Sequence, residues 1–227
     1  MPKQPPSSSF FRFLYENSLL LVGSALVLLT LAGQALTGWH DYNDDLREMG
    51  RAPLALGQYL TSGHFLEATF ENWESEFLQM GLYVLLTIGL RQKGSSESKK
   101  LYEEEEVDKE PDPNKPDAPG PVKRGGWQLS IYQHSLTLAF FLLFFAAVWL
   151  HAKGGAEVYS IEQQHDGKPA VTTLEYLGTE RFWFESLQNW QSEMLSIVSI
   201  VGLSIFLRQK GSPESKPVDA SHDDTGK

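Results

Sequence analysis

The sequence contains no cysteine among its 227 residues, which excludes disulfide bonds and thiolate-bound metal sites. It also lacks the short motifs of common enzyme and nucleotide-binding classes, with no G-x-x-x-x-G-K-S/T, G-x-G-x-x-G, H-E-x-x-H or G-x-S-x-G segment. Positive charge is scarce, because 19 Lys and Arg stand against 29 Asp and Glu, whereas nucleic-acid binding requires a basic surface. We therefore expect a protein that is not an enzyme and has no cofactor, no metal and no nucleic-acid partner.

What the sequence does contain is an internal repeat. The segment FLEATFENWESEFLQMGLYVLLTIGLRQKGSSESK at 65–99 returns as FWFESLQNWQSEMLSIVSIVGLSIFLRQKGSPESK at 182–216, at an offset of 117 residues with no gap. Both copies contain N-W-x-S-E, an apolar run and R-Q-K-G-S-x-E-S-K. Upstream, YENSLLLVG at Tyr15 corresponds to YQHSLTLAF at Tyr132 at the same offset. Self-similarity at one fixed offset over this length indicates that a whole module was duplicated.

Each half begins with a long apolar segment. The stretches Leu19–Ala32 and Leu136–Leu150 contain no charged residue, and with their flanks each reaches roughly 20 residues, enough to cross a hydrocarbon core of about 30 Å. The first could instead be a secretory signal peptide, because Gly33-Gln34-Ala35 resembles a small-residue cleavage site. The repeat argues against that alternative, since the equivalent segment at 127–150 lies in the middle of the chain.

The second apolar segment of each half is short and follows an amphipathic, aromatic stretch. In the first half it covers Phe77–Leu90, which as a helix is about 21 Å long and falls short of the hydrocarbon core. A span here requires a thinned bilayer, snorkelling of Arg91 and Lys93, or entry of the preceding polar residues into the membrane. We expect Trp73 and Trp190 to be interfacial anchors.

These segments predict the organisation of the chain. We expect a disordered N-terminus at 1–9, a first two-span repeat at 10–93, and a disordered, acidic, proline-rich linker at 94–126. A second two-span repeat at 127–210 and a disordered C-terminal tail at 211–227 complete it. Polar loops are predicted at 37–62 and 151–178. Of the 19 Lys and Arg, 14 lie on the side of the predicted termini and linker and five lie on the side of the two loops. The positive-inside rule then places both termini and the linker in the cytoplasm of a bacterium, with the spans in its inner membrane.

Polar residues recur where the second span of each half enters the membrane. Glu76 and Glu193 are the strongest candidates for function, because an ionisable residue near a span is costly unless it is used. Each shares a helical face with an Asn and a Ser. The full candidate set is Asn72, Ser75, Glu76, Asn189, Ser192 and Glu193. The two carboxylates could bind a cation or proton, or these side chains could simply form hydrogen bonds at helix ends and loops.

A second pattern has the spacing of metal ligands on a helix. His64, Glu67 and Glu71 follow one another at i, i+3 and i+7, but their repeat partners Arg181, Phe184 and Gln188 do not form a matching set. We therefore predict that this face is an exposed, solvated helix face and not a metal site.

The longer motifs resemble a known family. L-x-G-Q-x-L-T-G-W at Leu31–Trp39 and Y-L-T-S-G-H-F-L-E-A-T-F-E-N-W-E-S-E-F-L at 59–78 occur in the first half. In the second half they are E-Y-L-G-T-E-R-F-W-F-E-S-L-Q-N-W-Q-S-E and F-L-R-Q-K-G-S-P-E-S-K-P. This combination resembles a bacterial family of uncharacterised membrane proteins, classified as a domain of unknown function. The resemblance covers nearly the whole chain outside the linker and tails, and it implies a bacterial integral membrane protein but no substrate, cofactor or catalytic residue.

The sequence as a whole predicts an all-α integral membrane protein. Its four transmembrane helices form two tandem helical-hairpin repeats of parallel topology, and the hairpins pack together about a pseudo-twofold axis along the membrane normal. The expected function is a non-enzymatic structural or interaction role. Its partners are the lipid bilayer and either a second copy or another membrane protein. The alternative is a small cation or proton transporter that uses Glu76 and Glu193.

Overall fold

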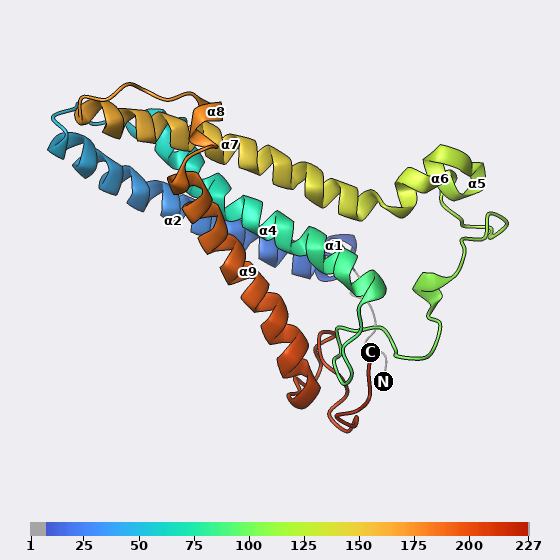
Figure 1. Cartoon of the computed structure of the whole chain (residues 1–227). Helices are drawn as coiled ribbons and strands as arrows, with labels where there is room; N and C mark the ends of the chain where they lie inside the picture. The colour runs from blue at the N-terminus through green and yellow to red at the C-terminus, as the bar shows by residue number, and fades with distance from the viewer. Residues whose placement is uncertain (1–7, 227) are drawn as a thin grey trace.

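The computed structural model describes residues 8–226, and that part of the chain contains helices and no strand (Figure 1). The prediction of an all-α fold is confirmed. Four long helices and six short ones follow each other along residues 8–226. The long helices are α2 (Ser18–Glu48), α4 (Gly63–Gly89), α7 (Ser135–His165) and α9 (Glu180–Phe206). The short ones are α1 (Ser9–Glu16), α3 (Leu56–Tyr59), η1 (Glu106–Asp108), α5 (Gly120–Arg124), α6 (Gly126–Gln133) and α8 (Thr173–Tyr176).

The helices of the second half repeat the bounds of those in the first. Helices α6, α7, α8 and α9 begin and end 117 residues after α1, α2, α3 and α4. The caps repeat as well, since the Ser62 side chain accepts a hydrogen bond from the Phe65 amide and the Thr179 side chain accepts one from the Phe182 amide. A side-chain oxygen at this position satisfies an N–H group that has no partner within the helix.

Both predicted loops are shorter than expected. Helix α2 continues to Glu48 and α7 to His165, so the first third or more of each predicted loop is helical. The helices end where Gly50 and Gly167 adopt φ of 72° and 73°, a left-handed conformation that glycine reaches without strain. The loop prediction was wrong because acidic residues do not break a helix, whereas these glycines do.

Each loop folds back onto its own long helix. In the first half, Asn43 both accepts from the Leu54 amide at 2.7 Å and donates to the Leu54 carbonyl at 3.0 Å. In the second half, Ser160 makes the same pair of bonds with Val171, at 2.9 and 3.1 Å. We call these paired hydrogen bonds the loop clamps. They hold α3 and α8 against the side of the long helix, and each short helix contributes one buried tyrosine.

The two halves meet through α4, which packs mainly against α7 and less extensively against α9. Close approach is possible because small residues line the contact. A Cβ atom on Gly154 would lie 2.5 Å from the carbonyl oxygen of Gly63, and one on Gly81 would lie 3.4 Å from Phe140. Helix α9 runs at an angle to both α4 and α7 (Figure 1).

Among the described residues, two helices are long and apolar enough to cross a membrane. They are α2, with a mean hydropathy of 2.1, and α7, with 2.0. None of the apolar window of α2 is buried, and 22% of that of α7 is. Side chains such as Leu19, which is 88% exposed, therefore face outward. Helices α4 and α9 do not meet the same criterion.

The predicted linker and tail contain little regular structure in the described range. Between residues 94 and 126 only η1 and α5 are helical before α6 begins. The tail bends back, with Lys216 Nζ donating to the carbonyls of Ser221, His222 and Asp224 and the Gly226 amide donating to Ser95. Of the predicted N-terminal segment, residues 1–7 lie outside the described part.

Candidate functional site

A buried cluster of polar side chains joins the two halves, and we refer to it as the interhelical polar cluster. On α7 it begins with His151, directly after the uncharged run that ends at Leu150. On α4 and α9 its members precede the apolar segments. The cluster therefore lies beyond the apolar part of all three long helices, at the end that carries the 37–62 and 151–178 segments. Its members are Glu67, Glu71, Glu74, His151, Tyr176, Arg181, Glu185, Ser186 and Trp190.

The centre of the cluster is His151, which is fully buried. Its Nδ1 atom lies 3.1 Å from Glu74 Oε2, and its Nε2 atom lies 3.4 Å from Glu185 Oε2. A neutral imidazole can donate from only one ring nitrogen, whereas the protonated ring donates from both. Two carboxylates on opposite sides of the ring therefore favour the charged form of His151.

Glu74 connects α4 to both long helices of the second half. It is fully buried, and besides His151 it accepts hydrogen bonds at Oε1 from Ser186 Oγ at 2.7 Å and from Trp190 Nε1 at 3.2 Å. A buried carboxylate is tolerated only when it is paired and hydrogen-bonded. Here every one of those partners comes from the other half of the chain.

Tyr176, on α8, brings two more carboxyl groups together. Its hydroxyl lies 2.6 Å from Glu185 Oε2 and 3.1 Å from Glu67 Oε1. A tyrosine has one hydroxyl proton, so only one of the two oxygens can receive it at a time. Burial and the nearby charge of Glu185 raise the pKa of Glu67 to about 7.

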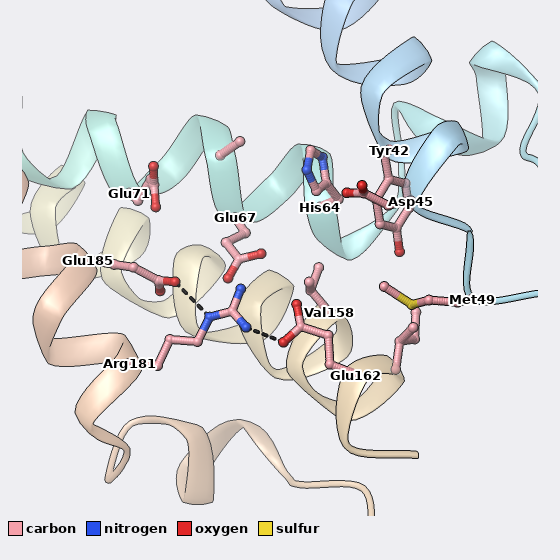
Figure 2. A pocket seen from close by; sticks show the side chains of 12 residues that line it. Tyr42, Asp45, Met49, His64, Glu67, Glu71, Val158, Glu162, Arg181 and Glu185 are labelled. Atoms are coloured by element: carbon pink, nitrogen blue, oxygen red, sulfur yellow. Dashed lines mark hydrogen bonds and ion pairs between the residues drawn. The ribbon is translucent and has the colours of Figure 1, made fainter. Parts of the chain in front are cut away.

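Glu185 is held in its charged form. Burial alone would raise its pKa, but hydrogen bonds from His151, Tyr176 and Arg181 outweigh burial and lower it. Arg181 Nε donates to Glu185 Oε1 at 2.9 Å, and the same guanidinium forms an ion pair with Glu162 of α7 (Figure 2). The central carbon of the Arg181 guanidinium also lies 5.7 Å from the ring centroid of Tyr159, a cation–π distance.

The cluster opens onto a cleft of about 270 Å³ formed by α2, α4, α7 and α9. Figure 2 shows that Glu67 of α4 and Arg181 and Glu185 of α9 approach one another across it. The carboxyl groups in or beside this region outnumber the cationic groups. The acids are Asp45, Glu67, Glu71, Glu74, Glu162 and Glu185, and the cationic groups are His151 and Arg181. The cleft therefore carries an excess of negative charge.

Among the described residues, three side chains of the cluster could together hold a metal ion. One atom each from Glu67, His151 and Glu185 lie within 4.8 Å of one another. The three come from α4, α7 and α9, so only the packing of the two halves assembles them.

Comparison with protein families matches residues 10–227 to the model of a domain of unknown function, DUF6766. The chain belongs to the DUF6766 family. Comparison with curated proteins and with solved structures found no match. The family description agrees with the resemblance on one point, a domain of unknown function. It assigns no substrate or activity, so any function has to be argued from the site.

The predicted polar residues of the DUF6766 chain lie next to the cluster. Asn72 is exposed and donates to the Ala68 carbonyl, and Asn189 is half-buried and donates to the Glu185 carbonyl. Ser75 is buried and donates to the Asn72 carbonyl, whereas Ser192 is exposed. These local bonds fit the interpretation that the Asn and Ser side chains serve their own helices.

The two carboxylates singled out in the sequence lie near each other on α4 and α9. Glu76 is exposed and Glu193 is half-buried, and the charge of Glu76 acts on Glu193. Gln79 donates to the Glu193 backbone carbonyl at 2.9 Å. The two predicted anchors differ, because Trp73 is 36% exposed whereas the Trp190 indole donates to Glu74.

One sequence-based prediction about this region was wrong. The face that carries His64, Glu67 and Glu71 is not a solvated surface, since Glu67 is only 6% exposed and the His64 ring stacks on Tyr42 at 4.4 Å. The prediction relied on repeat partners, which do not match. The cluster is assembled from residues of α4 and from residues of the second half that differ from their equivalents in the first half. Comparing the two copies of the repeat could therefore not detect it. The usable signal was His151, a titratable residue at the end of an uncharged run.

Proposed function

We propose that this DUF6766 chain is a four-span membrane protein with a non-enzymatic structural or interaction role. The observation that carries the proposal is the separation of exposed apolar surface from buried charge along the helical bundle. The apolar window of α2 is wholly unburied, whereas Glu74 and His151 at the other end of the bundle are fully buried. Apolar patches of this extent on a monomer are typical of surfaces that face lipid or a protein partner.

The ends of α4 and α9 support their assignment as the second and fourth spans. Arg91 donates to the carbonyls of Ile88 and Leu90 at the end of α4. Arg208, at the equivalent position after α9, donates to the carbonyls of Ser204, Ile205 and Leu207. A basic residue that satisfies the last carbonyls while its charge reaches the headgroups allows a short apolar helix to span.

In this proposal the interhelical polar cluster holds the bundle together. Hydrophobic burial does not drive helix association within lipid, so polar contacts and close packing do. Glu74 supplies the polar contacts, and the contact of Gly63 with Gly154 supplies the close packing. The exposed face of α2 then remains for lipid, for a second copy or for another membrane protein. Both termini and the linker lie in the cytoplasm, and the cluster lies near the outer face of a bacterial inner membrane.

Because the chain has no cysteine, single introduced cysteines test this topology directly. Glu48→Cys and Asp166→Cys place a thiol at exposed positions near the ends of α2 and α7, and Asp112→Cys places one in the exposed linker. With a membrane-impermeant maleimide on intact cells, we expect labelling of the first two and labelling of Asp112→Cys only after permeabilisation. Labelling of Asp112→Cys in intact cells, or recovery of the chain in the soluble fraction, would contradict the proposal.

A second candidate function, cation or proton transport, is favoured by a specific feature. A groove of about 270 Å³ between α4 and α9 is lined on one part by Gln79, Tyr83 and Ser196 and otherwise by Met80, Ile197 and Ile200. An adjoining groove of about 230 Å³ is lined in part by Tyr83 and Glu97. The Tyr83 hydroxyl donates to Glu97 Oε2 at 2.7 Å. Polar groups thus follow α4 from the neighbourhood of Glu76 toward the linker, as a proton relay requires.

Flux measurements separate the two candidates. In proteoliposomes with an imposed pH gradient and a pH-sensitive dye, a transporter would show flux that is lost in Glu76→Gln, Glu193→Gln and Tyr83→Phe. We expect no flux above that of empty liposomes, because our first proposal assigns these residues no transport role. Flux that the wild type supports and these variants lack would establish the second candidate instead.

A further inference from the structure

The arrangement around His151 is the one that proteins use to orient a metal-binding imidazole. Metal-ligating histidines commonly donate their second ring nitrogen to a carboxylate, which fixes the tautomer and the orientation of the ring. Here Nδ1 faces Glu74 Oε2 at 3.1 Å. Glu74 is itself fixed by Ser186 and Trp190. This leaves Nε2 as the nitrogen directed toward the two remaining carboxyl groups.

Glu185 is oriented in a similar way. Arg181 holds its Oε1 atom at 2.9 Å, so the Oε2 atom is the one that faces His151, at 3.4 Å from Nε2. Two ligands on one tetrahedral zinc ion, each about 2.0–2.1 Å from the metal, lie about 3.3 Å apart. The observed separation therefore already matches that of two ligands on a single ion.

Glu67 completes the set and explains the shared proton of Tyr176. With one hydroxyl proton between Glu67 Oε1 and Glu185 Oε2, Tyr176 can satisfy only one of these oxygens at a time, and the other donor that faces Glu185 Oε2 is the proton on His151 Nε2. A cation placed among Glu67, Glu185 and His151 would satisfy both oxygens. It would also offset the excess of carboxyl groups in the cleft.

The cleft provides a route for the ion. Glu67 and Glu185 line it together with Asp45, Glu71 and Glu162, and clustered charge of one sign raises the local concentration of counter-ions. Arg181 also lines the cleft, but its guanidinium is engaged by Glu162 and by Glu185 Oε1.

We propose that Glu67, His151 and Glu185 form a binding site for one divalent first-row transition-metal ion of the Zn²⁺ class, entered from the cleft. One imidazole nitrogen and two carboxylate oxygens suit this class. The metal takes the place of the proton between His151 Nε2 and Glu185 Oε2, and Glu74 acts as a positioning residue through Nδ1. The proposal departs from the expectation, drawn from the sequence, that the chain holds no metal. It does not depend on the proposed function, since it concerns only the folded cluster.

The test uses the full-length purified chain, in detergent or in buffer as its solubility requires, stripped of metal and titrated with Zn²⁺ by calorimetry. We expect one Zn²⁺ per chain, with affinity reduced at least tenfold by Glu67→Gln and by Glu185→Gln, in line with the loss seen on altering metal-site residues. The matched control is Glu71→Gln, which removes a neighbouring acid of α4 from the same cleft and should change affinity less than about threefold. Equal losses in all three variants would show diffuse attraction to an acidic cleft and overturn the proposal, as would the absence of stoichiometric binding.

A second measurement does not depend on whether the variants fold. Co²⁺ bound to the wild type in place of Zn²⁺ reports its coordination by visible absorption, and X-ray absorption at the zinc edge reports an imidazole ligand. We expect a four- or five-coordinate Co²⁺ spectrum and one histidine in the zinc shell. An octahedral, all-oxygen shell without histidine would overturn the proposal.

Discussion

The two halves of the chain share their framework but not their chemistry. Helix bounds, N-caps and loop clamps recur at an offset of 117 residues, yet the residues that face the cluster differ. The positions equivalent to His151, Tyr176, Arg181 and Glu185 are Gln34, Tyr59, His64 and Ala68. Only the tyrosine is retained.

In the first half these positions form a small, nearly uncharged set of contacts. Gln34 donates to Thr69 at 3.3 Å, and the Tyr59 hydroxyl lies 3.1 Å from His64 Nδ1. Burial lowers the pKa of His64 although nearby aspartates oppose the shift. In the second half the same backbone positions present charged groups to α4. The comparison indicates that the caps and glycines maintain the duplicated backbone, while the side chains at the interface with α4 differ between the two copies.

The divergence has a counterpart in packing. Helix α4 of the first half lies along α7 of the second, whereas α9 and α2, the equivalent pair, do not pack on each other to a comparable extent. One pair of helices therefore meets in a polar, close-packed contact and the other leaves its faces open. The predictions that follow test this asymmetry.

The largest effect is expected from making the second half resemble the first at its central residue. His151→Gln removes the cation between Glu74 and Glu185, and breaking a buried charge pair from one side costs about 3–5 kcal/mol. At the equivalent position of the first half, Gln34→Leu removes one long hydrogen bond to Thr69 and should cost about 1 kcal/mol. Thermal or SDS-induced unfolding followed by circular dichroism measures both. Similar losses in the two variants would mean that the halves are energetically equivalent.

A somewhat smaller effect is expected from closing the space between α4 and α7. In Gly154→Ala the new Cβ would meet backbone atoms of Gly63 and Glu67 at 2.5 Å, and backbone cannot move aside as a flexible side chain can. We expect a loss of about 1–3 kcal/mol. The equivalent residue, Thr37, is exposed, so Thr37→Ala should stay within about 0.5 kcal/mol. If Gly154→Ala is as stable as the wild type, α4 and α7 are farther apart than described.

The loop clamps should behave alike in the two halves. Asn43→Ala and Ser160→Ala each remove a side chain that holds the amide and carbonyl of one loop residue. We expect each to cost about 1–2 kcal/mol, with hydrogen exchange of the Leu54 and Val171 amides accelerated in the corresponding variant. Loss at only one clamp would show that the framework, too, has diverged.

An effect as small as that of a loop clamp is a pH dependence confined to one copy. Burial raises the pKa of Glu71 to about 7, opposed by His151 and Arg181 and reinforced by Glu185. Its folded form therefore prefers the neutral carboxyl. That contribution to stability is complete below the unfolded pKa of 4.5 and is lost as pH rises through about 7.

Glu71→Gln replaces this residue by the one found at the equivalent position, the exposed Gln188. We expect the variant to flatten the decline in stability between about pH 4.5 and 7 by about 1–2 kcal/mol. Unfolding midpoints measured across that range, in metal-free buffer, provide the test. A wild-type stability that rises with pH while the variant stays flat would reverse the assigned sign.

Much of the fold followed from local patterns. The long helices α2 and α7 were predictable from uncharged runs such as Leu136–Leu150. Their C-terminal ends were predictable from Gly50 and Gly167, whose left-handed conformation stops a helix. The loops were predicted too long because Asp and Glu near residues 41–48 were taken as loop residues, although acids tolerate a helix. The candidate site was predicted only in part. Glu76 and Glu193 stay a prediction, since the charge of Glu76 acts on Glu193 but both lie outside the cluster. Glu74, two residues from Glu76, was assigned to no site.

What the sequence by itself determined is the helical character of the chain, the duplication and the position of apolar segments, because these depend on residues close together along the chain. Only the tertiary structure decided which face of α4 is buried and what it meets. Glu74 and His151 are 77 residues apart, and no spacing rule links them. Their pairing follows from glycines at 63 and 154 that let two helices approach, and in that dry contact a buried carboxylate requires a partner, which His151 supplies.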